Sequence, residues 1–220
     1  MRADGPVHAA SILGNREAPA VTVVTATLLE ASLARLALRG RIPVERVGIG
    51  LSAGIPRSGA ALVSCGLAGS LSATVEPGAI VIPERVGSVD GSVYQCEPML
   101  VERLHDAAKR LQLRSISASL LTSPTLVVGP ERARWAAQGW EAVDMETAVL
   151  FALARQVAAV RVVLDSPKHE LSPEWQRSWR AALRPRHWME AARLAPSAAS
   201  QALLAARVVR EAFSPPAAIS

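Results

Sequence analysis

Two patterns of apolar and polar positions alternate along this chain. Short, wholly apolar runs rich in β-branched residues are typical of buried strands, and longer stretches with an apolar residue every three or four positions are typical of helices. The strands predicted in this way cover residues 21–26, 44–49, 60–65, 79–83, 115–121 and 158–164, with an irregular hairpin at 85–95. The predicted helices cover residues 28–38, 98–111, 130–138, 147–156 and 172–183. This alternation predicts an α/β fold: a three-layer sandwich with a mixed, largely parallel central sheet.

The first predicted helix has a clear start signal. Thr27 is followed three residues later by Glu30, which is the spacing of a capping box. Its apolar positions Leu29, Leu33, Leu36 and Ala37 fall on one side, which we expect to face the core. Glu30 also lies close to the end of the preceding strand, where open α/β sheets bind ligands. Capping alone is a sufficient explanation for Glu30 taken by itself.

The chain length of 220 residues suits one domain. We expect a flexible N-terminal segment at 1–20, a single domain at 21–213 and a frayed tail at 214–220. One or two further helices, broken near Pro196, are predicted within 186–213. No apolar run reaches the roughly 18 residues of a membrane span, and the first 20 residues lack the order of a signal peptide. The two cysteines, Cys65 and Cys96, fit a reduced, cytoplasmic protein.

The amino-acid composition narrows the classes of molecule that this protein could bind. The formal charge is +5 and the sequence pI is about 10.2, but the arginines are scattered and no basic run is interleaved with aromatic residues, so nucleic acid is disfavoured. An apolar face of the last helical stretch, edged by arginines, could lie on an anionic membrane surface, or it could pack on the domain or on a second subunit. That face contains Trp188, Leu194, Leu203, Leu204 and Val208. The histidines lack ligand spacing, so no metal site is predicted.

The most informative stretch is Asp144-Met145-Glu146, between a predicted strand and a helix. Acids at such a position either complement the helix dipole or meet a polar ligand, because an unpartnered buried charge is costly. An ionised carboxylate can accept hydrogen bonds from two vicinal hydroxyls. Asp165 stands alone at the end of another predicted strand. Glu30, Glu146 and Asp165 therefore converge on strand ends, and their convergence favours a functional site.

The order and spacing of four segments resemble the purine nucleoside phosphorylase and nucleosidase superfamily. These segments are the helix bearing Glu30, the sequence SCGLAGSL at 64–71, AVDMETA at 142–148 and VRVVLD at 160–165. The resemblance covers about residues 20–185. Within the superfamily the chain is most similar to the hopanoid-associated phosphorylases, which have a similar glycine-rich turn, a D-M-E run and a long tail. No cofactor is implied, although phosphate is expected as a co-substrate.

The resemblance implies a role for each matching residue. Glu146 would bind the ribose hydroxyls while Met145 packs on the sugar, and Asp165 would protonate N7 of a departing purine. Glu30 would activate water or bind a hydroxyl. A turn containing Gly66, Ala68 and Gly69 would lie behind the ribose or base, and Val127 would line the base. Gly50, in a Gly-x-Gly turn, and Arg57 are the candidate phosphate ligands.

Three departures from the superfamily pattern affect these roles. Leu164 stands where the superfamily usually has a serine just before the acid. No arginine stands near Ser64, where phosphorylases place one, although Arg57 or Arg85 could compensate. Only about ten residues separate Gly50 from the next strand, where a full helix is usual, and Pro56 disfavours a long helix there.

These observations predict an enzyme that cleaves the N-glycosidic bond of a 5′-modified adenosine and releases adenine. The resemblance implies adenosylhopane as substrate, phosphorolysis as the reaction, and a homo-oligomer. The apolar face of the last helical stretch would allow peripheral contact with the inner membrane surface. Two alternatives stay open: a hydrolytic nucleosidase of the same superfamily, and a degenerate member that binds a nucleoside or lipid without turnover.

Overall fold

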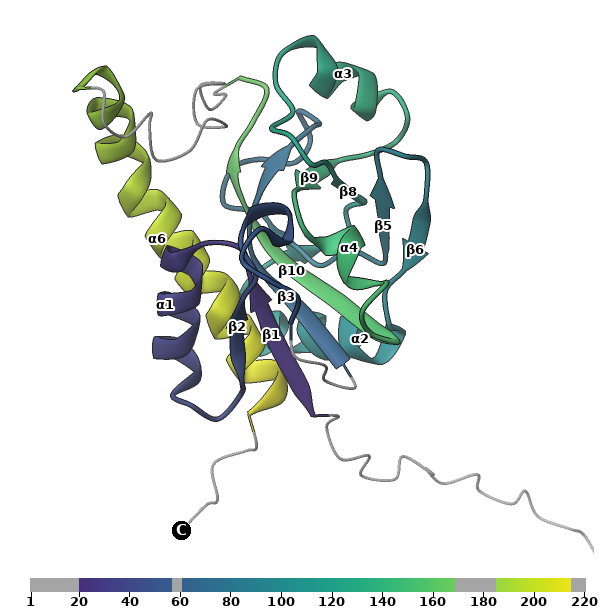
Figure 1. Ribbon diagram of the computed structural model, residues 1–220, viewed down its shortest axis with the longest axis vertical. Helices are drawn as coiled ribbons and strands as arrows, with labels where there is room; N and C mark the ends of the chain where they lie inside the picture. The colour runs from purple at the N-terminus through teal and green to yellow at the C-terminus, as the bar shows by residue number, and fades with distance from the viewer. Residues whose placement is uncertain (1–19, 57–60, 169–184, 215–220) are drawn as a thin grey trace, which may run out of the picture.

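A mixed β-sheet forms the centre of the computed structural model, which describes residues 20–56, 61–168 and 185–214, without the side chains of 185–195. The strand order is β6-β5-β8-β9-β3-β10-β4-β7, and β1 pairs with both β2 and β3 (Figure 1). Six of the strand pairs are parallel, and β10–β4, β3–β9 and β5–β6 are antiparallel. The strands are β1 (Val21–Thr25), β2 (Val44–Arg46), β3 (Ala61–Ser70), β4 (Ile80–Val81), β5 (Arg85–Ser88), β6 (Val93–Gln95), β7 (Ser115–Ile116), β8 (Leu120–Thr122), β9 (Ala142–Asp144) and β10 (Gln156–Asp165).

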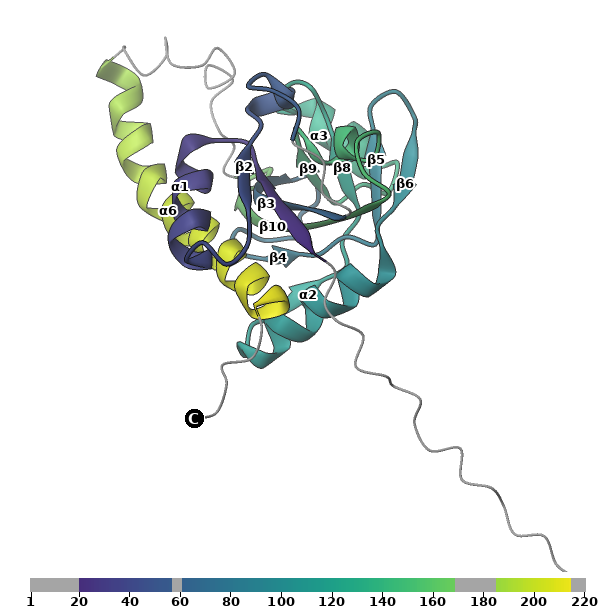
Figure 2. The ribbon, with the colours of Figure 1, turned by 60° about the horizontal axis from the view of Figure 1, so that its bottom comes forward.

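Helices cover both faces of this sheet. On one face α6 contacts α1, α2, β3 and β10, so it lies between the other two helices (Figure 2). On the other face α4 contacts β5 and β8. The helices are α1 (Leu28–Leu38), α2 (Pro98–Arg110), α3 (Pro130–Ala136), α4 (Thr147–Leu150) and α6 (Pro185–Phe213), with a 3₁₀ turn η1 at Ile49–Leu51.

Alternating residues of β1 and β3 supply the two cores. Val23 and Val63 belong to the large cluster that also contains residues of α1, α2 and α6. Their neighbours Val24 and Leu62 belong to a smaller cluster with Leu150 of α4. This alternation is the period-two pattern of a sheet buried on both faces. The predicted three-layer α/β sandwich with a mixed, largely parallel sheet is confirmed.

The capping box of α1 is confirmed, but its predicted buried face is only partly correct, because Ala37 is buried whereas Leu29 and Leu36 are exposed. The Thr27 hydroxyl accepts a hydrogen bond from the Glu30 amide, and the Glu30 carboxylate accepts one from the Thr27 amide. The buried residues of the helix are Glu30, Ala31, Ala34, Ala37 and Leu38. Leu29 and Leu36 are exposed. Alanines make up most of the buried face because small side chains allow α1 and α6 to approach closely, and of the leucines of α1 only Leu38 is fully buried.

The glycine-rich turn predicted at 66–69 is wrong, because these residues continue strand β3 to Ser70. Almost the whole of β3 pairs with β10 in parallel, and those backbone hydrogen bonds outweigh the low strand propensity of glycine. The helix predicted at 147–156 ends at Leu150. The strand predicted at 115–121 is two strands, since β7 pairs with β4 whereas β8 pairs with β5 and β9. The helix predicted at 172–183 lies outside the described residues.

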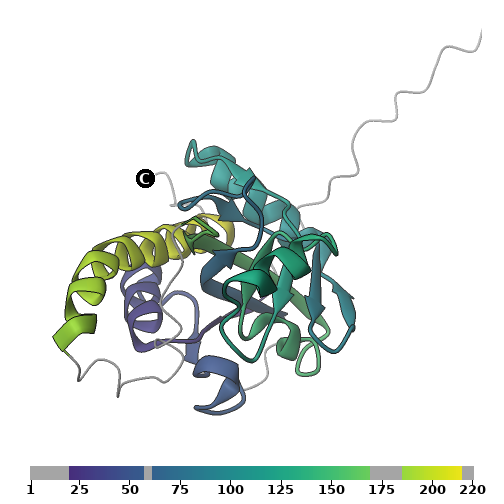
Figure 3. The same ribbon diagram turned by 90° about the horizontal axis from the view of Figure 1, so that it is seen from above.

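The break predicted near Pro196 is also wrong, because α6 continues through this proline. Figure 3 shows α6 as one curved helix beside α1. Val208 is fully buried, and Leu203 and Leu204 pack against the large core. These three residues therefore pack on the domain, whereas the side chains of Trp188 and Leu194, from the same predicted face, lie outside the described part of the chain. Within the described residues, no helix is both long and apolar enough to span a bilayer.

The corrected face of α1 predicts opposite effects for two substitutions. Ala34 is 1% exposed and Leu36 is 68% exposed. Ala34→Leu should lower the free energy of unfolding by about 1–3 kcal/mol, because it overpacks a closed helix interface. Leu36→Ala should change it by less than about 0.5 kcal/mol. Urea unfolding of the two variants measures both effects. A larger loss for Leu36→Ala than for Ala34→Leu would contradict this assignment of the buried face.

Candidate active site

A pocket with a volume of about 220 Å³ lies where β3, β9 and β10 end and α1 begins. It is lined by Ala26, Thr27, Glu30, Ile49, Leu67, Ala68, Gly69, Thr125, Leu126, Val127, Arg132, Val143, Asp144, Met145, Glu146, Leu164 and Asp165. The three acids that the sequence singled out, Glu30, Glu146 and Asp165, therefore meet at one pocket. Two clusters of polar side chains hold them there, one around Arg161 and one around Arg132.

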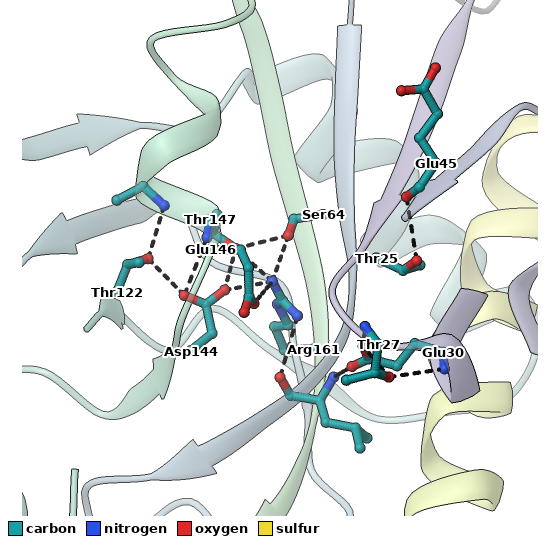
Figure 4. A network of polar contacts seen from close by, with 12 residues as sticks. Thr25, Thr27, Glu30, Glu45, Ser64, Thr122, Asp144, Glu146, Thr147 and Arg161 are labelled. Atoms are coloured by element: carbon teal, nitrogen blue, oxygen red, sulfur yellow. Dashed lines mark hydrogen bonds and ion pairs between the residues drawn. The ribbon is translucent and has the colours of Figure 1, made fainter. Parts of the chain in front are cut away.

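Arg161, in the middle of β10, is the centre of the first cluster (Figure 4). Its side chain is almost fully buried. Nη2 lies 2.6 Å from Oδ2 of Asp144 and 3.5 Å from Oε2 of Glu146. The same nitrogen donates hydrogen bonds to the hydroxyls of Ser64 (2.6 Å) and Thr147 (3.0 Å). One guanidinium thus joins β10 to β3 and to the junction of β9 with α4.

Asp144 braces that junction. Besides its ion pair with Arg161, it accepts hydrogen bonds from the hydroxyls of Thr122 (2.7 Å) and Thr147. Thr122 in turn accepts a hydrogen bond of 2.9 Å from the Ala148 amide. Asp144 is 5% exposed. Its several partners suit a structural role, in which it fixes the first turn of α4 and the neighbouring Glu146.

Glu146 is the more weakly paired acid of this cluster. It is 4% exposed, and burial raises its pKa to about 8, while Asp144 and Glu30 also raise the pKa and Arg161 and the Gly50 amide lower it. The backbone of Gly50, a predicted phosphate ligand, therefore lies near this carboxyl and favours its ionised form. In either protonation state this carboxyl can accept hydrogen bonds from ribose hydroxyls, and in its neutral state it can donate one as well.

Glu30 is held by the start of its own helix and by β3. Its Oε2 accepts hydrogen bonds from the amide and the hydroxyl of Thr27, both at 2.8 Å. Its Oε1 accepts a hydrogen bond of 2.9 Å from the Leu67 amide. A Cβ atom at Gly66 would lie 2.3 Å from Oε1. Gly66 is therefore needed to leave room for the Glu30 carboxylate, and it does not line the pocket directly.

Asp165 and Arg132 form the second cluster. Nη2 of Arg132 and Oδ2 of Asp165 form an ion pair in which both side chains are at most 3% exposed. Arg132 also donates to the carbonyls of Ser70 (2.6 Å) and Val127 (3.0 Å). A Cβ atom at Gly69 would lie 2.7 Å from Oδ1 of Asp165. The ion pair and the backbone at Gly69 together fix where the Asp165 carboxyl lies in the pocket.

Only some of the site residues predicted from the sequence line this pocket. Glu30, Ala68, Gly69, Val127, Met145, Glu146 and Asp165 line the pocket. Arg57 lies outside the described residues. Arg85 does not contribute, because its guanidinium bonds the Gly139 carbonyl and stacks over Trp140. Between Val47 and Pro56 the described chain contains a single 3₁₀ turn where the superfamily pattern predicts a helix.

Two arginines of the site were missed from the sequence. Arg161 interrupts the apolar run AAVRVVL, and a charge within a predicted buried strand was a usable signal of a buried ion pair. It also supplies the guanidinium near Ser64 that the sequence alone did not reveal. Arg132 gave no such signal, because Arg-rich short helices are usually solvated. No group of three or more His, Cys, Asp or Glu side chains in the described part of the chain is arranged to hold a metal ion.

Comparisons with known proteins identify the family. The model of the phosphorylase superfamily matches residues 57–204, which is more than half of the chain. The chain belongs to the phosphorylase superfamily. No match was found among curated proteins.

Several solved structures share the fold of this chain. A 5′-methylthioadenosine/S-adenosylhomocysteine nucleosidase from Neisseria meningitidis, in complex with methylthio-immucillin-A, aligns with a TM-score of 0.66 and 18% identity over 89% of this chain and 99% of that chain. An S-adenosylhomocysteine nucleosidase from Streptococcus pyogenes gives 0.69 and 14% over 91% and 98%. The futalosine hydrolase of Helicobacter pylori gives 0.67 and 12% over 87% and 96%. At these identities the likeness establishes the fold.

The raised pKa of Glu146 predicts how stability changes with pH. Its ordinary value is 4.5 and its folded value is about 8, so between these values the folded state binds more protons than the unfolded state. The free energy of unfolding should therefore fall as pH rises from about 5 to 8, by a few kcal/mol at most. Glu146→Gln removes this group and should flatten the decline. Urea unfolding at several pH values tests this, and equal slopes for both proteins would contradict it.

Proposed function

We propose that this protein cleaves the N-glycosidic bond of a purine nucleoside. The observation that carries the proposal is that Asp165 and Glu146, each held by its own arginine, line one pocket in a member of the phosphorylase superfamily. Two of the similar structures are nucleosidases and one is a hydrolase of futalosine. In this proposal Glu146 binds the ribose hydroxyls and Met145 packs on the sugar. Asp165 meets the base, beside Val127.

The proposed reaction balances with these residues. The bond between C1′ and N9 breaks, its electron pair moves onto the purine, and a proton passes from Asp165 to N7. The sugar carbon, which carries oxocarbenium character, is attacked by the acceptor. If the acceptor is water, its proton passes to Glu30, whose carboxylate lines the same pocket. Protonation of the leaving base by a positioned acid contributes a factor of roughly 10²–10⁴ to such a rate.

Electrostatics favour water as the acceptor. Glu30, Asp144 and Glu146 line the pocket, and Arg161 already bonds Asp144, Ser64 and Thr147. Among the described lining residues the one cation is Arg132, which is paired with Asp165. A phosphate dianion beside several carboxylates would be repelled. Phosphorolysis, with Arg57 as a phosphate ligand, is the second candidate because the sequence most resembles phosphorylases.

The decisive assay measures purine release with and without phosphate. We expect release from 5′-substituted adenosines in phosphate-free buffer, and a fall in kcat of about 10²–10⁴ in Asp165→Asn, because the leaving base loses its proton donor. Release of adenine and of the free sugar is followed by chromatography. A strict requirement for phosphate, with a sugar 1-phosphate as product, would instead establish phosphorolysis. Binding of adenine without any release would establish a non-catalytic binding protein.

The 5′ substituent is proposed to be apolar. Ile49 lines the pocket and is 48% exposed, and Leu28, next to the lining residue Thr27, is 69% exposed. Apolar side chains at a pocket mouth suit a hydrocarbon group, in line with the resemblance to the hopanoid-associated phosphorylases and their adenosylhopane substrate. Such a lipid-linked substrate would also account for peripheral contact with a membrane.

Substrates of increasing 5′ chain length test this specificity. Each added methylene that becomes buried contributes about 0.8 kcal/mol, so kcat/KM should rise roughly three- to fourfold per carbon over the first few carbons. Ile49→Ser should weaken this rise, whereas Leu36→Ser, a change at an exposed leucine of α1, should not. A kcat/KM that is independent of chain length in the unmodified protein would contradict an apolar substituent.

A further inference from the structure

Arg132 makes more connections than an ordinary residue of a short surface helix. It belongs to α3 and yet its side chain is 1% exposed. It reaches the carbonyl of Ser70 at the end of β3, the carbonyl of Val127 in the loop before α3, and the carboxylate of Asp165 at the end of β10. One guanidinium thus links three segments that meet at the pocket.

The side chain of Arg132 also separates two pockets. It lines the pocket that contains the acids and a second pocket of about 630 Å³, whose other lining residues include Leu71, Pro130 and Pro167. Truncation of Arg132 to alanine would join the two pockets and change the shape of the site. Methionine, which is similar in length and unbranched, removes the charge while keeping much of the wall.

Leu164 cannot orient Asp165. The pairing of β10 with β3 shifts register between Val163 and Asp165, and both Leu164 and Asp165 line the pocket. Leucine has no group that can hydrogen-bond a carboxyl. The superfamily pattern has a serine at this position, so the orientation of Asp165 has to come from elsewhere in this chain.

We propose that Arg132 is the positioning residue of Asp165: it holds the carboxyl, between its own guanidinium and Gly69, in the orientation in which the carboxyl meets N7 of the departing purine. This inference rests on the proposed function. It assigns to the helix α3, which carries no acid of the reaction, a direct part in the leaving-group chemistry. Loss of the guanidinium should then slow the reaction about as much as loss of the acid.

Leaving-group chemistry distinguishes a positioning role from a merely structural one. An ordinary purine takes the electron pair of the broken bond and needs a proton on N7. A purine methylated on N7 already carries a positive charge, so it departs as a neutral base and takes no proton from Asp165. A residue that acts only through Asp165 should therefore matter for the first kind of nucleoside and not for the second.

The experiment compares Arg132→Met, Asp165→Asn and the double variant on one purine nucleoside and on its N7-methylated counterpart. We expect each single variant to lose about 100-fold or more in kcat on the unmethylated substrate and to stay within about threefold of the unmodified protein on the methylated one. The double variant should be no worse than Asp165→Asn. The matched control is Arg134→Met, which changes an exposed arginine of the same helix that pairs with Glu131 and should leave both rates unchanged.

Equal losses of Arg132→Met on the two substrates would overturn the proposal, as would unchanged rates on both. Arg132→Met leaves a buried carboxylate without its cation, so folding of each variant is checked by circular dichroism. If Arg132→Met fails to fold, Arg132→Lys, which keeps the charge but loses the fork of donors, carries the test: its loss must be confined to the unmethylated substrate. Absence of release from either substrate by the unmodified protein would sink the proposed function itself.

Discussion

A single buried guanidinium, that of Arg161, is the contact on which the rest of the site depends. It is surrounded by Asp144, Glu146 and the hydroxyls of Ser64 and Thr147. Burying an ion pair gives little net stability, but removing one partner leaves uncompensated charge in the interior, which typically costs about 3–5 kcal/mol. Removal of either the acids or the arginine alone would therefore destabilise the fold. Together they fix where β3, β9 and β10 end relative to α4.

Two parts of the pocket are built in the same way. At each of two places a glycine of β3 leaves room for a carboxylate, Gly66 for Glu30 and Gly69 for Asp165. At each place an arginine from another element comes close to the acid or to its neighbours. Gly66 and Gly69 are an odd number of residues apart along a strand, so they face opposite sides of the sheet. Strand β3 is therefore the shared wall from which both ends of the pocket are constructed.

The sequence predicted the fold class, the Thr27–Glu30 capping box and the meeting of three acids, because each follows from local periodicity or from the rule that strands deliver ligand-binding residues at their carboxyl ends. It mispredicted what depends on distant partners. The glycine run at 66–69 looked like a turn because its pairing with β10, nearly a hundred residues away, cannot be read locally. The buried face of α1 was misassigned in part, because small side chains pack toward α6 and Leu29 and Leu36 are left exposed. Arg132 was invisible because only the folded chain brings it to Asp165.

The bond between Glu30 and the Leu67 amide has a consequence for motion. The carboxylate that caps α1 is also a partner of the central strand, thirty-seven residues further along the chain. Fraying of the first turn of α1, a common low-energy fluctuation of helix ends, would release the strand amide and change the pocket at the same time. Exchange of the Leu67 amide hydrogen with solvent would then depend on the fraction of time for which that helix end is open. Exchange of this one backbone hydrogen therefore reports on the opening of the pocket.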